Sequence, residues 1–91
     1  MSNLPPFNQE ELMNKQEILT GALAAREDEV FQYQINIDNY TLALQDLEAM
    51  NDPDLAAFEQ QLKSLLASER LEQKKAKVML GVVKKQLEAM K

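Results

Sequence analysis

The chain has 91 residues, a formal net charge of −5, and neither cysteine nor histidine. Without these two residue types it lacks Ser-His-Asp and Cys-His nucleophilic sites and the usual zinc and redox sites, so we expect neither an enzyme nor a cofactor. The negative charge argues against binding to nucleic acid or acidic membranes, because such binding requires cationic groups at the phosphates. Only two glycines and three prolines occur. Together with the abundance of Ala, Leu, Glu, Gln and Lys, this predicts an all-α protein.

The length of the chain favours association. A single domain of this size buries only somewhat more than half of the surface of its unfolded chain, so contact with a further chain is a common source of stability. Residues 1–7 show no signal-peptide pattern, and no stretch reaches the roughly 18 apolar residues of a membrane span. The absence of cysteine fits a reducing compartment. We therefore expect a cytoplasmic protein that binds itself, makes no membrane contact, and carries residues 1–7 as a flexible tail.

A first helix is predicted over residues 8–50. Asn8 is a favourable N-cap residue, and Glu11 follows three positions later, as in a capping box. Two sets of apolar residues then recur at seven-residue spacing and form one coiled-coil stripe, which Gln16 and Arg26 interrupt. The first set is Leu12, Leu19, Tyr33, Tyr40 and Leu47, and the second is Leu23, Val30, Ile37 and Leu44.

A turn is predicted at residues 51–52 and a second helix over residues 53–90. Asp52 can cap this helix, and Pro53 suits its first position while disfavouring helical geometry in the residue before it. The apolar pattern here is less regular, with a polar stretch over residues 68–75 between two apolar halves. The apolar residues are Leu55, Phe58, Leu62, Leu65, Leu66, Ala76, Leu80, Val83, Leu87 and Met90.

The two helices are predicted to form a long antiparallel hairpin that makes residues 8–91 a single domain. Folding the chain at residues 51–52 places residue i opposite roughly residue 103 − i, so that apolar residues of the two helices meet. Leu44 then lies against Phe58 as a buried pair near the turn, and the polar stretch faces residues 26–33. At 1.5 Å per residue each arm would be about 60 Å long.

Charge is distributed unevenly between the predicted arms. Residues 8–54 are acidic apart from Lys15 and Arg26, whereas basic residues prevail over 70–91. The hairpin places Glu27-Asp28-Glu29 opposite residues 74–77 and Glu17 opposite residues 84–85, so we expect ion pairs between the arms. Three alternatives remain open. The lysines can bind phosphates, the charges can form a solvated face, or the acidic helix can imitate a DNA backbone.

Six large apolar residues remain once the contact between the helices has been filled. In the first helix they are separated by four and seven residues, and in the second by seven and four, so each set forms one stripe directed away from the other arm. Exposed apolar stripes of this kind mark a surface that packs against a partner. We expect a second copy of the hairpin to be this partner in a four-helix arrangement, with a different protein as the alternative. The candidate protein interface is Phe31, Ile35, Leu42, Leu71, Val78 and Val82.

Two stretches resemble small uncharacterised helical proteins of bacteriophages and prophages. They are Tyr33-Gln-Ile-Asn-Ile-Asp-Asn-Tyr40 and Leu71-Glu-Gln-Lys-Lys-Ala-Lys77. The resemblance spans about residues 20–90, transfers no site, and implies an accessory protein acting in a bacterial cytoplasm on a host or phage component. The helices around Asn51-Asp-Pro-Asp54 are also similar in architecture to the hairpin chaperones and needle subunits of bacterial secretion systems.

These observations together predict a non-enzymatic, homo-oligomeric adaptor, assembly or accessory protein. One alternative is an acidic inhibitor that blocks a host enzyme of nucleic-acid processing or defence. A second alternative is a helical chaperone of the secretion type.

Overall fold

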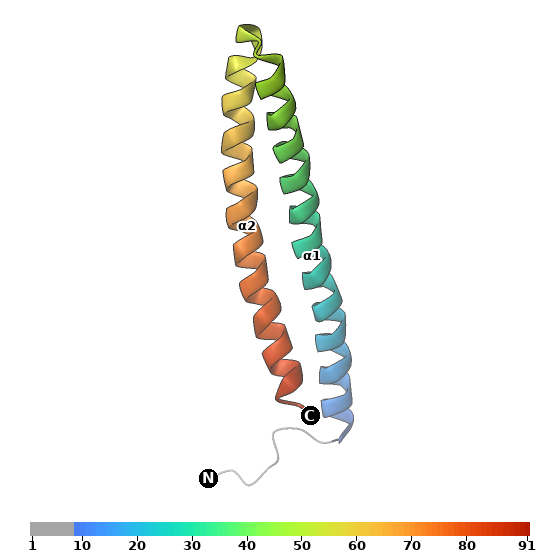
Figure 1. The fold of residues 1–91 in the computed structure, drawn as a ribbon. Helices are drawn as coiled ribbons and strands as arrows, with labels where there is room; N and C mark the ends of the chain where they lie inside the picture. Colours follow the sequence, from blue (N-terminus) through green and yellow to red (C-terminus); the bar gives the residue numbers. More distant parts are fainter. Residues whose placement is uncertain (1–8) are drawn as a thin grey trace.

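The computed structural model describes residues 9–91. It contains a long helix α1 (Gln9–Met50), a short 3₁₀ helix η1 (Pro53–Leu55) and a second long helix α2 (Ala56–Glu88). From the turn at one end, α1 and α2 run side by side in opposite directions (Figure 1). The expected all-α antiparallel hairpin is therefore confirmed. The predicted capping residue Asn8 lies outside the described residues.

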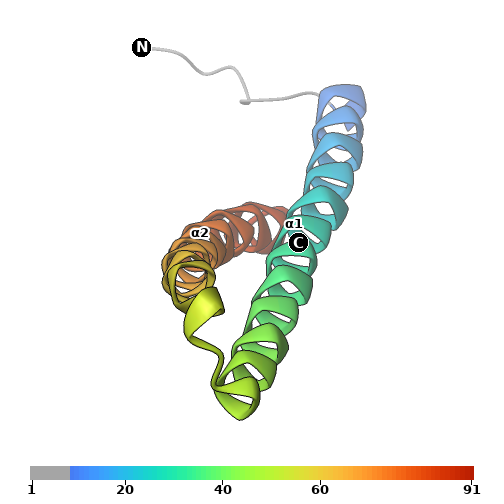
Figure 2. The ribbon, with the colours of Figure 1, turned by 90° about the horizontal axis from the view of Figure 1, so that it is seen from above.

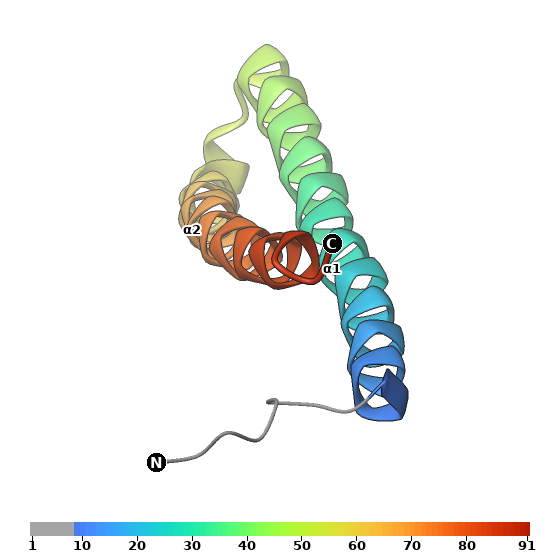
Figure 3. The same ribbon diagram turned by 90° about the horizontal axis from the view of Figure 1, so that it is seen from below.

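The hairpin is a thin rod. Its principal extents are 70 × 23 × 14 Å and its radius of gyration is 20.8 Å, whereas a compact chain of this length would have a radius of about 12 Å. Seen along the rod, α1 and α2 are inclined to each other rather than strictly parallel (Figures 2 and 3). Over residues 9–91, each long helix is covered only along the side that faces the other.

The contact between α1 and α2 follows a seven-residue repeat. On α1 the predicted stripe is the buried one, with Leu19, Ile37 and Leu47 buried most deeply. On α2 the residues that turn towards α1 recur at alternating steps of four and three, the spacing of a coiled coil. We call these two facing lines of residues the seam. From the end of η1 through α2 to the residues after it, the second line of the seam consists of Leu55, Glu59, Leu62, Leu66, Glu69, Gln73, Ala76, Leu80, Val83, Leu87 and Met90.

The first half of the α2 seam differs from the sequence-based prediction. The apolar pattern places Phe58 and Leu65 in the buried stripe, but their side chains are 48% and 39% exposed, and Glu59 is half-buried instead. Each residue turns a helix by about 100°, so Phe58 lies about a quarter turn away from Glu59. The predicted burial of Phe58 against the half-buried Leu44 is therefore wrong.

The turn is built from three consecutive residues. Asn51 has the left-handed backbone conformation that often ends a helix (φ 49°), and its N–H donates to the Leu47 carbonyl at 3.0 Å. The Asp52 carboxylate accepts a hydrogen bond from the Asp54 N–H at 2.9 Å, and Pro53 occupies the first position of η1. The predicted capping role of Asp52 is confirmed, although the cap starts η1 and α2 follows from Ala56.

Replacing Asp52 with Ala should lower the free energy of unfolding by about 1 kcal/mol, because the capping acceptor for the Asp54 N–H is lost. Urea unfolding followed by circular dichroism measures this change. The Asp52→Asn variant is the control, since its side-chain oxygen can still accept the hydrogen bond and it should stay within about 0.5 kcal/mol of the parent. An Ala variant as stable as the parent would show that the cap contributes nothing.

Candidate protein interface

The middle of the seam is polar, as residues 68–75 predict. Gln73 is 8% exposed, and its side-chain Nε2 donates to the Gln34 side-chain oxygen at 2.9 Å and to the Val30 carbonyl at 3.3 Å. Nearby, Asn36 Nδ2 donates to Glu69 Oε2 at 3.4 Å. Because residue 73 bonds to residue 30, the register expected from folding at residues 51–52 is confirmed halfway along the rod.

Gln73 should determine the register of the hairpin more than its stability, since a buried polar residue in a seam fixes alignment at a cost in free energy. In Gln73→Leu the exposed Gln34 can bond to water, so the variant should match the parent or gain about 1 kcal/mol. In Gln73→Ala both packing and the hydrogen bonds are lost, so it should lose about 1–3 kcal/mol. Urea unfolding of both variants measures this difference. A loss of more than about 2 kcal/mol in Gln73→Leu would show that the amide is a net source of stability.

One flank of the seam carries several exposed apolar side chains. On α2 it carries Phe58, Leu65 and Met79, each directly before a seam residue and each exposed. On α1 the matching positions recur every seven residues and include Asn36, whose hydrogen bond to Glu69 places it on this side, because Glu69 is one turn after Leu65. We call this surface the apolar flank. Its apolar residues are Ala22, Ala43 and Met50 on α1 and Phe58, Leu65 and Met79 on α2, and the polar residues Lys15, Glu29, Asn36, Glu72 and Gln86 occupy its other positions.

The opposite flank is charged. A cavity of about 410 Å³ opens there, with Glu27 and Gln34 of α1 and Lys77 of α2 in its lining, so these residues share one side of the hairpin. On α2, basic residues directly follow seam residues at seven-residue steps, while α1 carries acidic residues on the same side. We call this surface the charged flank. Its residues are Glu17, Glu27, Asp38 and Glu48 on α1 and Lys63, Arg70, Lys77 and Lys84 on α2.

The predicted ion pairs between the arms are not formed. The ion pairs that the structure shows each join residues three positions apart in the chain. They are Arg26 with Glu29 at 3.2 Å, Lys75 with Glu72 at 3.0 Å and Lys91 with Glu88 at 3.3 Å. Within residues 9–91, no ion pair joins the acidic residues 27–29 or residue 17 to a lysine of α2. Glu29 has its partner on its own helix, and Glu27 and Lys77 line the cavity without pairing.

The six interface residues predicted from the sequence are all exposed, from 38% for Ile35 to 66% for Val78. They do not gather on one surface, because each stripe turns away from the other helix, and the stripes therefore face in opposite directions. A single partner surface cannot cover both. Phe31 also lines the cavity of the charged flank. The stripes are Phe31, Ile35 and Leu42 on α1, and Leu71, Val78 and Val82 on α2.

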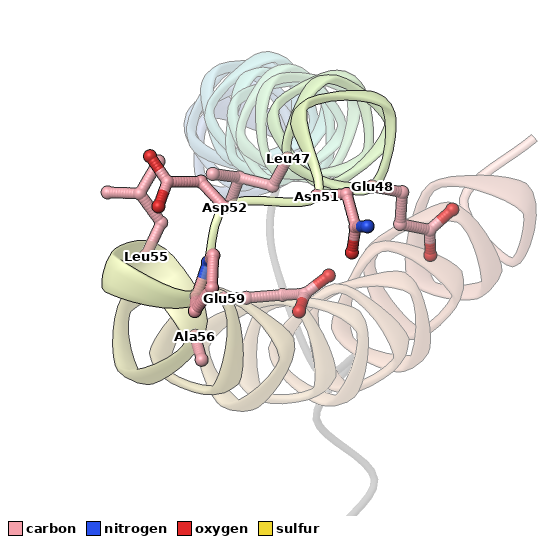
Figure 4. A pocket seen from close by; sticks show the side chains of 8 residues that line it. Leu47, Glu48, Asn51, Asp52, Leu55, Ala56 and Glu59 are labelled. Atoms are coloured by element: carbon pink, nitrogen blue, oxygen red, sulfur yellow. The ribbon is translucent and has the colours of Figure 1, made fainter.

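A smaller cavity of about 330 Å³ lies at the turn. Its lining includes three carboxylates, and Figure 4 shows the Glu59 side chain extending towards Asn51. In the part of the chain that the structure describes, no three acidic residues come together as a metal site would require. The carboxylates of this cavity are Glu48, Asp52 and Glu59.

Comparison of the chain with known protein families, with curated proteins and with solved structures finds no match. Neither long helix within residues 9–91 contains an apolar stretch long enough to cross a lipid bilayer. Function is therefore inferred from the two flanks and the outer stripes of the hairpin.

Proposed function

We propose that the chain is a non-enzymatic protein-interaction module, a helical hairpin that associates with itself and serves as an adaptor or assembly protein. The supporting observation is the excess of exposed over buried apolar side chains. Among the described residues seven apolar side chains are buried, whereas thirteen large apolar ones are exposed. Scattered exposed apolar residues are ordinary, but a continuous apolar surface marks a site of association.

The apolar flank is the surface that suits self-association best. Four of the thirteen exposed side chains lie on it, and three of these are on α2. The rod offers a face of up to 70 × 23 Å, and covering about half of that face buries the roughly 800 Å² per partner that stable interfaces need. A second hairpin packed on this flank would convert the contact between two helices into a four-helix bundle. The four side chains are Met50, Phe58, Leu65 and Met79.

Light scattering coupled to size-exclusion chromatography tests this proposal. We expect a mass of at least two chains of 10.4 kDa each. The protein concentration should run from about 1 to 100 µM, a range that covers ordinary protein affinities. An apolar contact should persist in about 1 M NaCl, where the Debye length falls to about 3 Å. A mass of one chain at every concentration would contradict the proposal.

A second candidate function is inhibition of an enzyme that binds nucleic acid, with the acidic side of α1 imitating phosphates. The observation in its favour is that α1 has nine acidic and two basic residues, and those of the charged flank make no ion pair to α2 within the described residues. Such an enzyme binds nucleic acid in a positively charged channel, so its contact with α1 would be ionic. Binding of the chain to the enzyme should therefore weaken steeply as the salt concentration increases. Binding that is indifferent to salt would exclude this function. The resemblance to phage proteins makes bacterial enzymes the first targets to test.

A further inference from the structure

We infer that a second contact between copies joins the two outer stripes, with α1 of one hairpin packed antiparallel against α2 of the next. The stripes face in opposite directions, so each hairpin covers its α1 stripe with one neighbour and its α2 stripe with another. Because the two surfaces in contact differ, the contact repeats from copy to copy without closing. This inference goes beyond the proposed association through the apolar flank, since it uses a different surface and predicts a row of hairpins.

Each outer stripe belongs to a second coiled-coil line on its helix. When the charged residues between the apolar ones are included, both stripes recur at alternating steps of three and four, the same spacing as the seam. We call these two sets the outer lines, and all their residues are exposed in the single hairpin. On α1 the outer line is Asp28, Phe31, Ile35, Asp38 and Leu42. On α2 it is Leu71, Lys75, Val78, Val82 and Lys85.

The two outer lines complement each other residue by residue. Followed towards the turn, each line reads charged, apolar, apolar, charged, apolar, but the charges are acidic on α1 and basic on α2. If residue i of α1 lies opposite residue 113 − i of the neighbour's α2, every apolar residue meets an apolar one and every acid meets a base. Such complementary charges fix the orientation and register of partners. The pairs are Asp28 with Lys85, Phe31 with Val82, Ile35 with Val78, Asp38 with Lys75 and Leu42 with Leu71.

Other registers of the same two lines are unfavourable. The lines stay in contact only if the helices slide in steps of seven residues. A step in one direction sets Phe31 against Lys75, and a step in the other sets Ile35 against Lys85. Both would bury an ammonium group among apolar side chains, which is costly. Packing a line on its own copy fails too, because each line carries charges of one sign, which then meet each other or apolar side chains.

The surroundings of the outer lines fit this register. Beyond the lines, residues 24, 45 and 49 of α1 and residues 89, 68 and 64 opposite them have small or uncharged side chains. Beside the lines, like charges meet where Glu27 lies near the neighbour's Glu88, and Glu88 already pairs with Lys91 at 3.3 Å. Within one hairpin residue 30 bonds to residue 73, so neighbouring copies are displaced along the rod by ten residues, or about 15 Å.

This contact is smaller than the one proposed for the apolar flank. It joins one helix of each copy over about 40 Å, and a helix is about 10 Å wide. The area falls below the roughly 800 Å² per partner that stable interfaces need. Rows should therefore form well above the micromolar range, so the masses expected at micromolar concentration are unchanged.

Disulfide trapping between two variants tests the register. The chain has no cysteine, so Ile35→Cys can be mixed in turn with Leu71→Cys, Val78→Cys or Lys85→Cys at about 1 mM in a glutathione buffer. A disulfide needs Cα atoms within about 7 Å, whereas a step of seven residues moves a helix by about 10 Å. Each partner variant therefore reports one register. Mass spectrometry separates mixed pairs from pairs of a single variant.

The mixed disulfide with Val78→Cys should exceed the other two at least about fivefold. A preference for Leu71→Cys or Lys85→Cys, or equal yields with all three, overturns the inference. Light scattering at micromolar concentration reports separately on the apolar flank. An oligomer there without the disulfide between residues 35 and 78 refutes this inference alone, and the disulfide with a single-chain mass refutes the flank contact alone.

A charge exchange across the contact is the matched control. Lys85→Glu in the Val78→Cys copy sets two acidic groups together, so the yield of the mixed disulfide should fall at least about fivefold. Adding Asp28→Lys to the Ile35→Cys copy should restore the yield, because acid again meets base. Restoration would not occur if the first substitution had only damaged α2. A yield that neither substitution changes shows that residues 28 and 85 do not meet and contradicts the register.

Discussion

Leu62→Ala is expected to lower the free energy of unfolding by about 2–5 kcal/mol, as truncation of a buried leucine does. Leu62 is 5% exposed, the most deeply buried large side chain among the described residues. It lies in the seam, and the hairpin has no second layer of side chains that could close the resulting cavity. A chain of this length has about 5–14 kcal/mol of stability in total. The variant should therefore lose a large part of its resistance to denaturant.

Urea unfolding followed by circular dichroism measures the loss, and Leu71→Ala provides the matched control. The chemical change is the same, but Leu71 is 53% exposed on the outer side of α2. Its variant should stay within about 0.5 kcal/mol of the parent when measured as a single chain. Equal losses in the two variants would contradict the seam described for α2.

The fold follows from local signals in the sequence. The regular stripe of α1 predicts the face that is buried, and the Asp52-Pro53 pair predicts the chain reversal. Counting outward from residues 51–52 then places residue 73 opposite residue 30, as the hydrogen bond between them confirms. These signals suffice because a helix, a cap and a register each depend on a few neighbouring residues.

The placement of Phe58 and Leu65 is what hydrophobicity alone predicts incorrectly on α2, whereas the other apolar residues of the predicted pattern lie in the seam. Phe58 is apolar and Glu59 is acidic, so composition assigns the first to the seam, yet the structure turns the second inward. The seven-residue repeat assigns this seam position correctly. Traced back from Leu80 through Gln73 and Leu66, it arrives at Glu59. A continuous contact along the whole helix outweighs the burial of one phenylalanine near its end.

The apolar flank contains both of these residues, Phe58 and Leu65, so the apolar pattern of the sequence does not reveal it. Because each residue turns the helix by about 100°, Phe58 and Leu65 lie about a quarter turn away from the seam residues that follow them. The apolar pattern places both residues in the core, whereas the structure places them on the apolar flank. The predicted ion pairs failed for a related reason, since long exposed side chains find partners three residues away on their own helix, as Arg26 does with Glu29.

Leu65→Asp is expected to dissociate the assembly while leaving the hairpin folded. At the centre of a contact the new carboxylate would be buried without a partner, which costs several kcal/mol, and each 1.4 kcal/mol raises the dissociation constant about tenfold. A rise of at least about 100-fold is therefore predicted. Within a single hairpin Leu65 is 39% exposed, so an aspartate there reaches water and α2 should persist.

The most direct measurement of self-association through the apolar flank is light scattering of the parent, Leu65→Asp and Phe31→Asp at one micromolar-range concentration. Phe31 is the matched control, because it belongs to the outer stripe of α1 and is 65% exposed. We predict an oligomer for the parent and for Phe31→Asp, and a single chain with unchanged helix content for Leu65→Asp. An oligomer that survives Leu65→Asp, or one that only Phe31→Asp dissociates, would contradict this account and would place the contact elsewhere, in the second case on the outer stripe.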